Sequence, residues 1–106
     1  MKNQRPPKLE RVLELARDCI EKGKYLPTFH AECRQFERDI TLLDALRVIR
    51  QGYREPKHDQ FKEEWQSWNY AVRGETLQGD TVRVIISFDD KEKLLIITVI
   101  NIVKRE

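Results

Sequence analysis

The sequence predicts a single α+β domain in which N-terminal helices pack on one face of a three- to four-stranded antiparallel sheet. Apolar residues recur with helical spacing in the N-terminal half, alternate as in strands from Trp68 onward, and are separated there by short turns. Short turns between strands indicate antiparallel neighbours. A chain of 106 residues with 40% hydrophobic content supports one compact core, so residues 1–106 are expected to form one domain.

The first helix is expected over residues 7–23. Residues 1–6 are polar and are expected to be frayed, whereas Pro6-Pro7 suits a first helical turn and Gly23 suits a helix end. One apolar face is formed by Leu9, Val12, Leu13, Ala16 and Ile20. Pro27 prevents a helix from continuing through KYLPTF, which is therefore predicted to be a connector.

A second helix is expected over residues 29–40, and it would carry two neighbouring stripes. Successive residues of a helix are about 100° apart, which places His30, Arg34 and Arg38 on one basic stripe. The adjacent apolar stripe consists of Phe29, Cys33, Phe36 and Ile40. The basic side chains would therefore flank the core rather than enter it.

A third helix is expected from Thr41 to Gly52. Thr41 and Asp44 have the spacing of a capping box, and Gly52 suits the helix end. The inward face is formed by Leu42, Leu43, Ala45, Leu46 and Ile49.

The C-terminal half is expected to form the sheet. A short strand at residues 53–55 and a polar loop precede three strands over about residues 68–75, 81–88 and 94–103. In the first two long strands the residues predicted to share one face are Trp68, Tyr70 and Val72, and Val82, Val84, Ile86 and Phe88. The third, LLIITVINIV, is apolar on both faces, which indicates a central strand.

The charge distribution permits a local phosphate-facing patch. Net charge is +2, but residues 1–54 carry 12 Lys/Arg against 8 Asp/Glu, whereas residues 55–106 carry 8 against 10. A mixed-sign solvated surface would have the same composition. No apolar run reaches the roughly 20 residues of a membrane span, and Cys19 and Cys33 fit a reduced cytoplasmic protein, with a disulfide between them as the alternative.

The segment HAECRQFERDIT resembles the His-Ala-x-x-Arg-x-x-x-Arg-x-Ile motif of a family of small bacterial proteins that is grouped with RelE-like and BrnT-like toxins. The resemblance continues through VIRQG, YAVRGETLQGDTVRVIISFDD and LIITVI. It implies a RelE-like core over residues 28–104, to which residues 7–23 add an N-terminal helix. The motif residues fall on His30, Arg34, Arg38 and Thr98. The resemblance also implies a type II toxin that acts on RNA and pairs with a zinc-finger or helix-turn-helix antitoxin.

The chemistry of RNA cleavage gives the motif residues their expected roles. Cleavage without a metal needs a base, an acid and a cation that stabilises the phosphate. His30 would exchange a proton, while Arg34 and Arg38 would hold the phosphate. Tyr70, His58 and Glu37 are the candidates for a second proton carrier.

RNA contacts are expected from Arg73, Arg83, Trp65 and His58, because cations bind phosphate and aromatic rings stack on unpaired bases. Ordinary packing and solvation would explain the same residues. His30 could cap or pack a helix, and Arg34 and Arg38 could pair with acidic neighbours. Thr98 could form a hydrogen bond within the core.

The sequence therefore predicts a cytoplasmic toxin with endoribonuclease activity on mRNA, free or on the ribosome. No metal or cofactor is expected, because the histidines and cysteines are scattered, and no membrane association is expected. The alternative is a non-catalytic module on the same fold that binds nucleic acid or protein.

Overall fold

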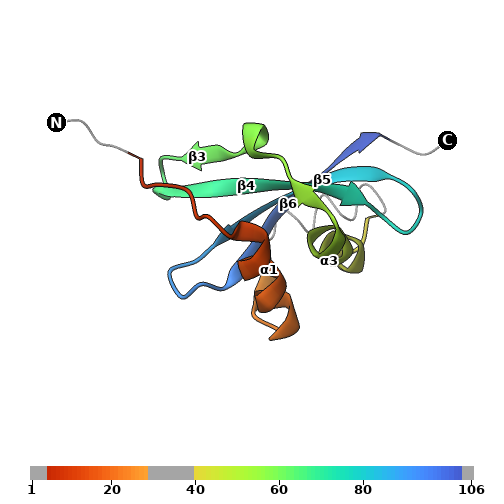
Figure 1. Ribbon diagram of the computed structural model, residues 1–106, viewed down its shortest axis with the longest axis horizontal. Helices are drawn as coiled ribbons and strands as arrows, with labels where there is room; N and C mark the ends of the chain where they lie inside the picture. The colour runs from red at the N-terminus through yellow and green to blue at the C-terminus, as the bar shows by residue number, and fades with distance from the viewer. Residues whose placement is uncertain (1–4, 29–39, 104–106) are drawn as a thin grey trace.

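The computed structural model describes residues 5–28 and 40–103 of the chain (Figure 1). In chain order the described elements are α1 (Val12–Glu21), β1 (Tyr25–Pro27), α3 (Leu42–Gln51), β2 (Tyr53–Arg54), the 3₁₀ turn η1 (Pro56–His58), β3 (Gln60–Lys62), β4 (Ser67–Glu75), β5 (Thr81–Phe88) and β6 (Leu94–Val103). Residues 29–39 of the expected second helix lie outside the described residues, and so do His30, Arg34 and Arg38.

The described strands form one six-stranded mixed sheet in the order β1-β6-β5-β4-β2, and β3 pairs with another part of β4. The predicted α+β arrangement, with N-terminal helices on a three- to four-stranded antiparallel RelE-like sheet, is therefore wrong. In chain order β1 comes between the two described helices, and in the sheet it pairs with β6 in parallel. Strands β1, β2 and β3 have two or three residues each. They are too short for an alternating pattern and depend on pairing with longer strands.

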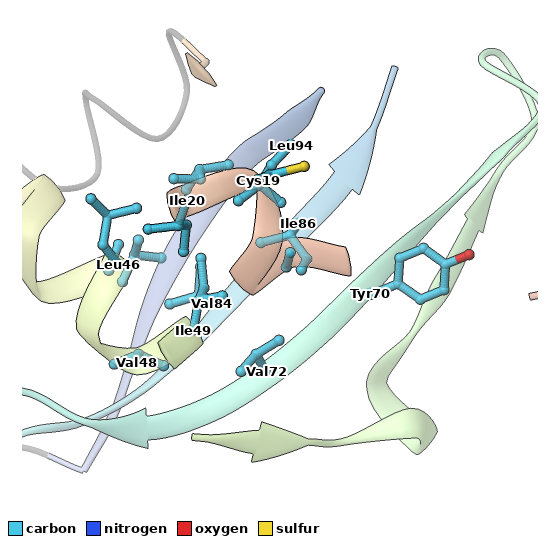
Figure 2. Packing of buried hydrophobic residues seen from close by; sticks show 14 of the residues in the cluster. Cys19, Ile20, Leu46, Val48, Ile49, Tyr70, Val72, Val84, Ile86 and Leu94 are labelled. Atoms are coloured by element: carbon cyan, nitrogen blue, oxygen red, sulfur yellow. The ribbon is translucent and has the colours of Figure 1, made fainter. Parts of the chain in front are cut away.

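The hydrophobic core lies between the two described helices and one face of the sheet (Figures 1 and 2). The buried helical residues are Val12, Ala16, Cys19 and Ile20 on α1, and Ala45, Leu46, Val48 and Ile49 on α3. They pack against Val72, Val84, Ile86, Leu94 and Ile96 of the three long strands. The opposite face of β4, β5 and β6 is not covered by the described helices. Neither described helix has the length and apolar content needed to cross a membrane.

The ends of α3 follow the sequence signals closely. The Thr41 hydroxyl accepts a hydrogen bond from the Asp44 backbone N–H at 3.2 Å, and the Asp44 carboxylate accepts one from the Thr41 backbone N–H at 3.1 Å. This reciprocal capping box confirms the predicted start, and Gly52 is the C-terminal cap. The predicted start of the first helix is wrong, because α1 begins at Val12.

Residues 5–9, which we call the N-terminal strap, cross the β3–β4 hairpin instead of forming a helical turn. The Pro6 carbonyl accepts a hydrogen bond from Trp68 Nε1 at 2.8 Å, and the Leu9 backbone N–H donates to the Tyr70 hydroxyl at 3.1 Å. The Arg5 guanidinium lies over the rings of Phe61 and Trp68. These tertiary contacts satisfy the backbone groups that a helix would otherwise use.

We expect Gly52→Ala to destabilise the fold far more than Gly23→Ala. A Cβ at Gly52 would overlap the carbonyl oxygens of Arg73 and Val48, whereas a Cβ at Gly23 meets nothing within 4 Å. Gly23 has a φ of 72°, so its substitution costs only about 1–2 kcal/mol of backbone strain. Gly52→Ala should lower the free energy of unfolding by roughly 3 kcal/mol or more. Urea denaturation measures the free energy of unfolding of both variants. Equal losses of free energy would contradict the close packing of α3 on β4.

Candidate functional site

Cross-strand pairing aligns one residue from each of four strands across the sheet. This arginine row consists of Tyr53 on β2, Arg73 on β4, Arg83 on β5 and Ile100 on β6. The chain neighbours Val72, Val84 and Val99 are buried in the core. Successive strand residues point to opposite faces, so the arginine row lies on the face that the described helices leave uncovered.

Glu55 joins the two arginines of this row through one carboxylate. Arg83 Nε donates to Glu55 Oε1 at 2.6 Å, and Arg73 Nη1 donates to Glu55 Oε2 at 3.1 Å. The hydrogen bond from Arg83 lowers the pKa of Glu55; burial opposes this effect, and the bond from Arg73 adds to it. Each guanidinium carries five N–H donors. Both arginines therefore keep further donors for a ligand, and the trio retains one net positive charge.

A cleft of about 320 Å³ opens on this face beside the arginine row, and we call it the basic cleft. Its ionisable lining residues are His58, Lys62 and Arg83. Its other lining residues are Gln60, Asn69 and Thr98, which are polar, and Ile85, Ile97 and Ile100, which are apolar. The cleft thus combines an aliphatic lining with cationic and hydrogen-bonding groups, and none of these lining residues is acidic.

A β-bulge in β6 shapes one side of the basic cleft. Ile85 pairs with Thr98, but the next residue, Ile86, pairs with Ile96, which leaves Ile97 as an extra residue. The bulge breaks the alternation of side chains, so the consecutive residues Ile97 and Thr98 both line the cleft. Among the described residues the buried Thr98 Oγ1 has no hydrogen-bond partner. Thr98 thus brings a hydroxyl without a described partner into the wall of the cleft.

The opposite wall of the basic cleft is held in place by Asp59, whose side chain is completely buried. Arg54 donates to both carboxylate oxygens at 2.9 and 2.6 Å, the Ala71 backbone N–H donates at 2.8 Å, and Lys8 Nζ lies 2.9 Å away. Burial raises the pKa of Asp59, but these hydrogen bonds outweigh burial and leave the pKa below its ordinary value. Asp59 follows η1 directly, so this network fixes the position of His58.

The residues predicted to form the site lie in different places. Arg83 and His58 line the basic cleft, and Arg73 lies beside Arg83 in the arginine row. Trp65 is 74% exposed in the turn between β3 and β4. Tyr70 lies on the helix-covered face at the end of the core cluster, where Figure 2 shows its hydroxyl pointing away from the aliphatic side chains. Tyr70 therefore does not join the residues of the cleft.

Sequence patterns did not indicate Lys62 and Asn69, which line the basic cleft, or Glu55, which joins the two arginines. Lys62 and Asn69 reach the cleft through the β3–β4 pairing, in which Lys62 lies opposite Ser67 and Gln60 lies opposite Asn69. A hairpin signal could have been found, because only the residues Glu63–Gln66 separate the two paired segments.

In the described part of the chain α1 and α3 cover one face of a mixed sheet, and Arg73, Arg83 and the basic cleft lie on the other face. Residues 28–101 match the family described as Domain of unknown function (DUF4258), and the chain belongs to this family. The matched region begins after the N-terminal strap, α1 and β1. No curated protein and no solved structure has significant similarity to the chain. Among the described residues no group of three His, Cys, Asp or Glu side chains could hold a metal ion.

We expect Asp59→Asn to lower the free energy of unfolding by about 3 kcal/mol, because the half-buried Arg54 would lose its buried counter-charge. Asp90→Asn is the matched control: Asp90 is exposed in the β5–β6 turn and should change stability by less than about 0.5 kcal/mol. Urea denaturation at pH 7 measures both variants. Similar denaturation midpoints would contradict the central role of the buried carboxylate.

We also expect wild-type stability to fall in acid. The folded-state pKa values of Glu55 and Asp59 are both depressed, so their contributions are fully present above the ordinary carboxyl pKa of about 4. These contributions are lost as the pH falls through the lower folded-state values. Between pH 7 and pH 3 the free energy of unfolding, measured by urea denaturation, should fall less for Asp59→Asn than for the wild type. An equal fall in both proteins would assign the acid sensitivity to other groups.

Proposed function

We propose that the protein binds single-stranded RNA in the basic cleft. The supporting observation is that its ionisable lining residues, His58, Lys62 and Arg83, are all basic and surround an aliphatic lining. Cationic side chains attract the phosphate backbone, and the aliphatic surface can accommodate the faces of the sugar and the base. Gln60, Asn69 and Thr98 add hydrogen-bonding groups for base edges or the ribose 2′-hydroxyl.

Two exposed aromatic residues on segments that adjoin the basic residues favour RNA over an acidic peptide as the ligand. Trp65 is 74% exposed in the turn that follows β3, which carries Lys62, and Tyr53 is 58% exposed in the arginine row. Exposed aromatic rings beside cations are typical of sites where unpaired bases stack. A peptide carboxylate would use the cations alone and would leave both rings in solvent.

A second proposal is that the bound RNA is cleaved without a metal, as the resemblance to toxins implies. The observation that favours it is the presence of His58 in the same cleft as Arg83 and Lys62. Histidine can act as acid or base near neutral pH, and the two cations can stabilise the phosphate. Cleavage needs a second proton carrier, for which His30 of the motif is the candidate. RNA binding therefore has the broader support, since the described cleft supplies one proton carrier and two cations.

If the protein cleaves RNA, it fits a cytoplasmic toxin that acts on mRNA, either free or on the ribosome. Its partner would then be an antitoxin with a zinc-finger or helix-turn-helix domain. Arg34 and Arg38 would assist His30 by holding the phosphate, as the motif implies.

For RNA binding, we expect Arg83→Ala to weaken the affinity for a single-stranded RNA oligonucleotide by about tenfold or more, because a charge-assisted phosphate contact is lost. The dependence of log Kd on log salt concentration should decrease by about 0.7. Fluorescence anisotropy at several salt concentrations measures both effects.

Lys22→Ala is the matched control for this experiment. Lys22 lies at the end of α1, on the helical side of the sheet, and pairs only with the exposed Asp18 in the described structure. The variant loses the same unit of charge away from the cleft and should bind RNA like the wild type. Equal losses in both variants would indicate non-specific attraction and would contradict the basic cleft as the binding site.

For cleavage, we expect His58→Ala and His30→Ala each to lower the rate of RNA cleavage by about 100-fold or more, while RNA binding is retained. The rate should be unaffected by EDTA.

Induced expression should arrest growth, and His30→Ala or Arg34→Ala should relieve the arrest at equal protein level. Arrest that persists in both variants would refute the motif as the catalytic site.

A further inference from the structure

A second cleft, of about 390 Å³, lies at the other side of the arginine row, and we call it the corner cleft. It is bounded by the C-terminal end of α3 and the end of β4, and Arg73 lies in its wall. Its polar and aromatic lining consists of Arg47, Gln51, Tyr53, Arg73, Glu75 and Thr81. The two clefts therefore flank the same pair of arginines.

The charges of the two clefts differ. The ionisable lining residues of the basic cleft are all basic, whereas the corner cleft contains the exposed carboxylate of Glu75 beside Arg47 and Arg73. Arg73 and Arg83 share Glu55, so this carboxylate lowers the positive potential of both clefts and Glu75 makes the difference between them. A phosphate would be attracted to the basic cleft, whereas in the corner cleft Glu75 would oppose the attraction of Arg47 and Arg73. The corner cleft thus suits a neutral part of a nucleotide.

The aromatic and acceptor groups of the corner cleft fit a nucleobase. Tyr53 is 58% exposed and lies opposite Arg73, so its ring is available for stacking. Glu75 lies two residues beyond Arg73 on the same face of β4, about 7 Å along the strand. A carboxylate accepts hydrogen bonds and donates none when ionised. It therefore favours a base edge that carries an amino group, as in adenine, cytosine or guanine, over that of uracil, whose N3–H lies between two carbonyl oxygens that repel a carboxylate.

We infer that a single RNA strand crosses the arginine row and places an amino-bearing base in the corner cleft, stacked on Tyr53 and hydrogen-bonded to Glu75. This inference rests on the proposed RNA binding and adds a base-selective subsite to it. From Asn69 to Glu75 the two clefts extend about 20 Å along β4. A stacked strand covers that length with about six nucleotides, and an extended strand needs fewer.

The test compares the affinities of nine-nucleotide oligomers of adenosine, cytidine and uridine by fluorescence anisotropy. The wild type should bind the adenosine and cytidine oligomers about fivefold or more tighter than the uridine oligomer, because a base-specific hydrogen bond discriminates by at least this factor. Glu75→Ala should abolish the preference. Tyr53→Ala should lower the affinity for all three oligomers by about tenfold. Tyr53→Phe, which keeps the ring, should bind them like the wild type.

Arg83→Ala separates this inference from the proposed function. This variant should have a lower affinity for all three oligomers but should keep the preference for amino-bearing bases, because the substitution leaves the corner cleft intact. Equal binding of the three oligomers by the wild type, a preference that survives Glu75→Ala, or an unchanged affinity of Tyr53→Ala would each overturn the subsite while RNA binding stands. No measurable binding of any oligomer would overturn the proposed function itself. Thermal unfolding of each variant checks that the fold is retained.

Discussion

The buried carboxylate of Asp59 is the interaction on which the arrangement of the site depends. It receives hydrogen bonds from Arg54, from the Ala71 backbone and from Lys8, which belong to β2, β4 and the N-terminal strap. A buried charge without partners would be costly, so Asp59 couples the stability of these elements. Because Asp59 lies between η1 and β3, the same network sets one wall of the basic cleft. The strap, which lies outside the family match, therefore supports a wall built by the family domain.

Glu55 has a different role on the open face of the sheet. Two neighbouring arginines on adjacent strands repel each other, and one carboxylate between them reduces that repulsion. It also orients both guanidinium groups while leaving donors free for a ligand. The basic cleft lies on this face beside Arg83, whereas the corner cleft lies at the end of β4, between Arg73 and the C-terminal end of α3.

The long elements could be predicted because their signals are local. The capping box of Thr41 and Asp44 located α3, and the alternation in β4 and β5 identified their buried faces. The short strands β1 and β3 carry no comparable pattern, and the parallel pairing of β1 with β6 depends on contacts between distant residues. Pro6-Pro7 gave a valid local signal for a helix start. Hydrogen bonds to Trp68 and Tyr70 prevailed over it.

The sequence alone determined that Arg73 and Arg83 lie opposite the core face of their strands, because side-chain alternation is a property of the strand itself. It also suggested His58 as a residue that could contact RNA. Only the tertiary structure decided that Arg83 and His58 share a cleft, and that Tyr70, on the opposite face, contacts the N-terminal strap instead. Strand register, the β6 bulge and the Asp59 network bring these residues together or keep them apart. Such contacts join residues far apart in the chain, and local sequence patterns do not encode them.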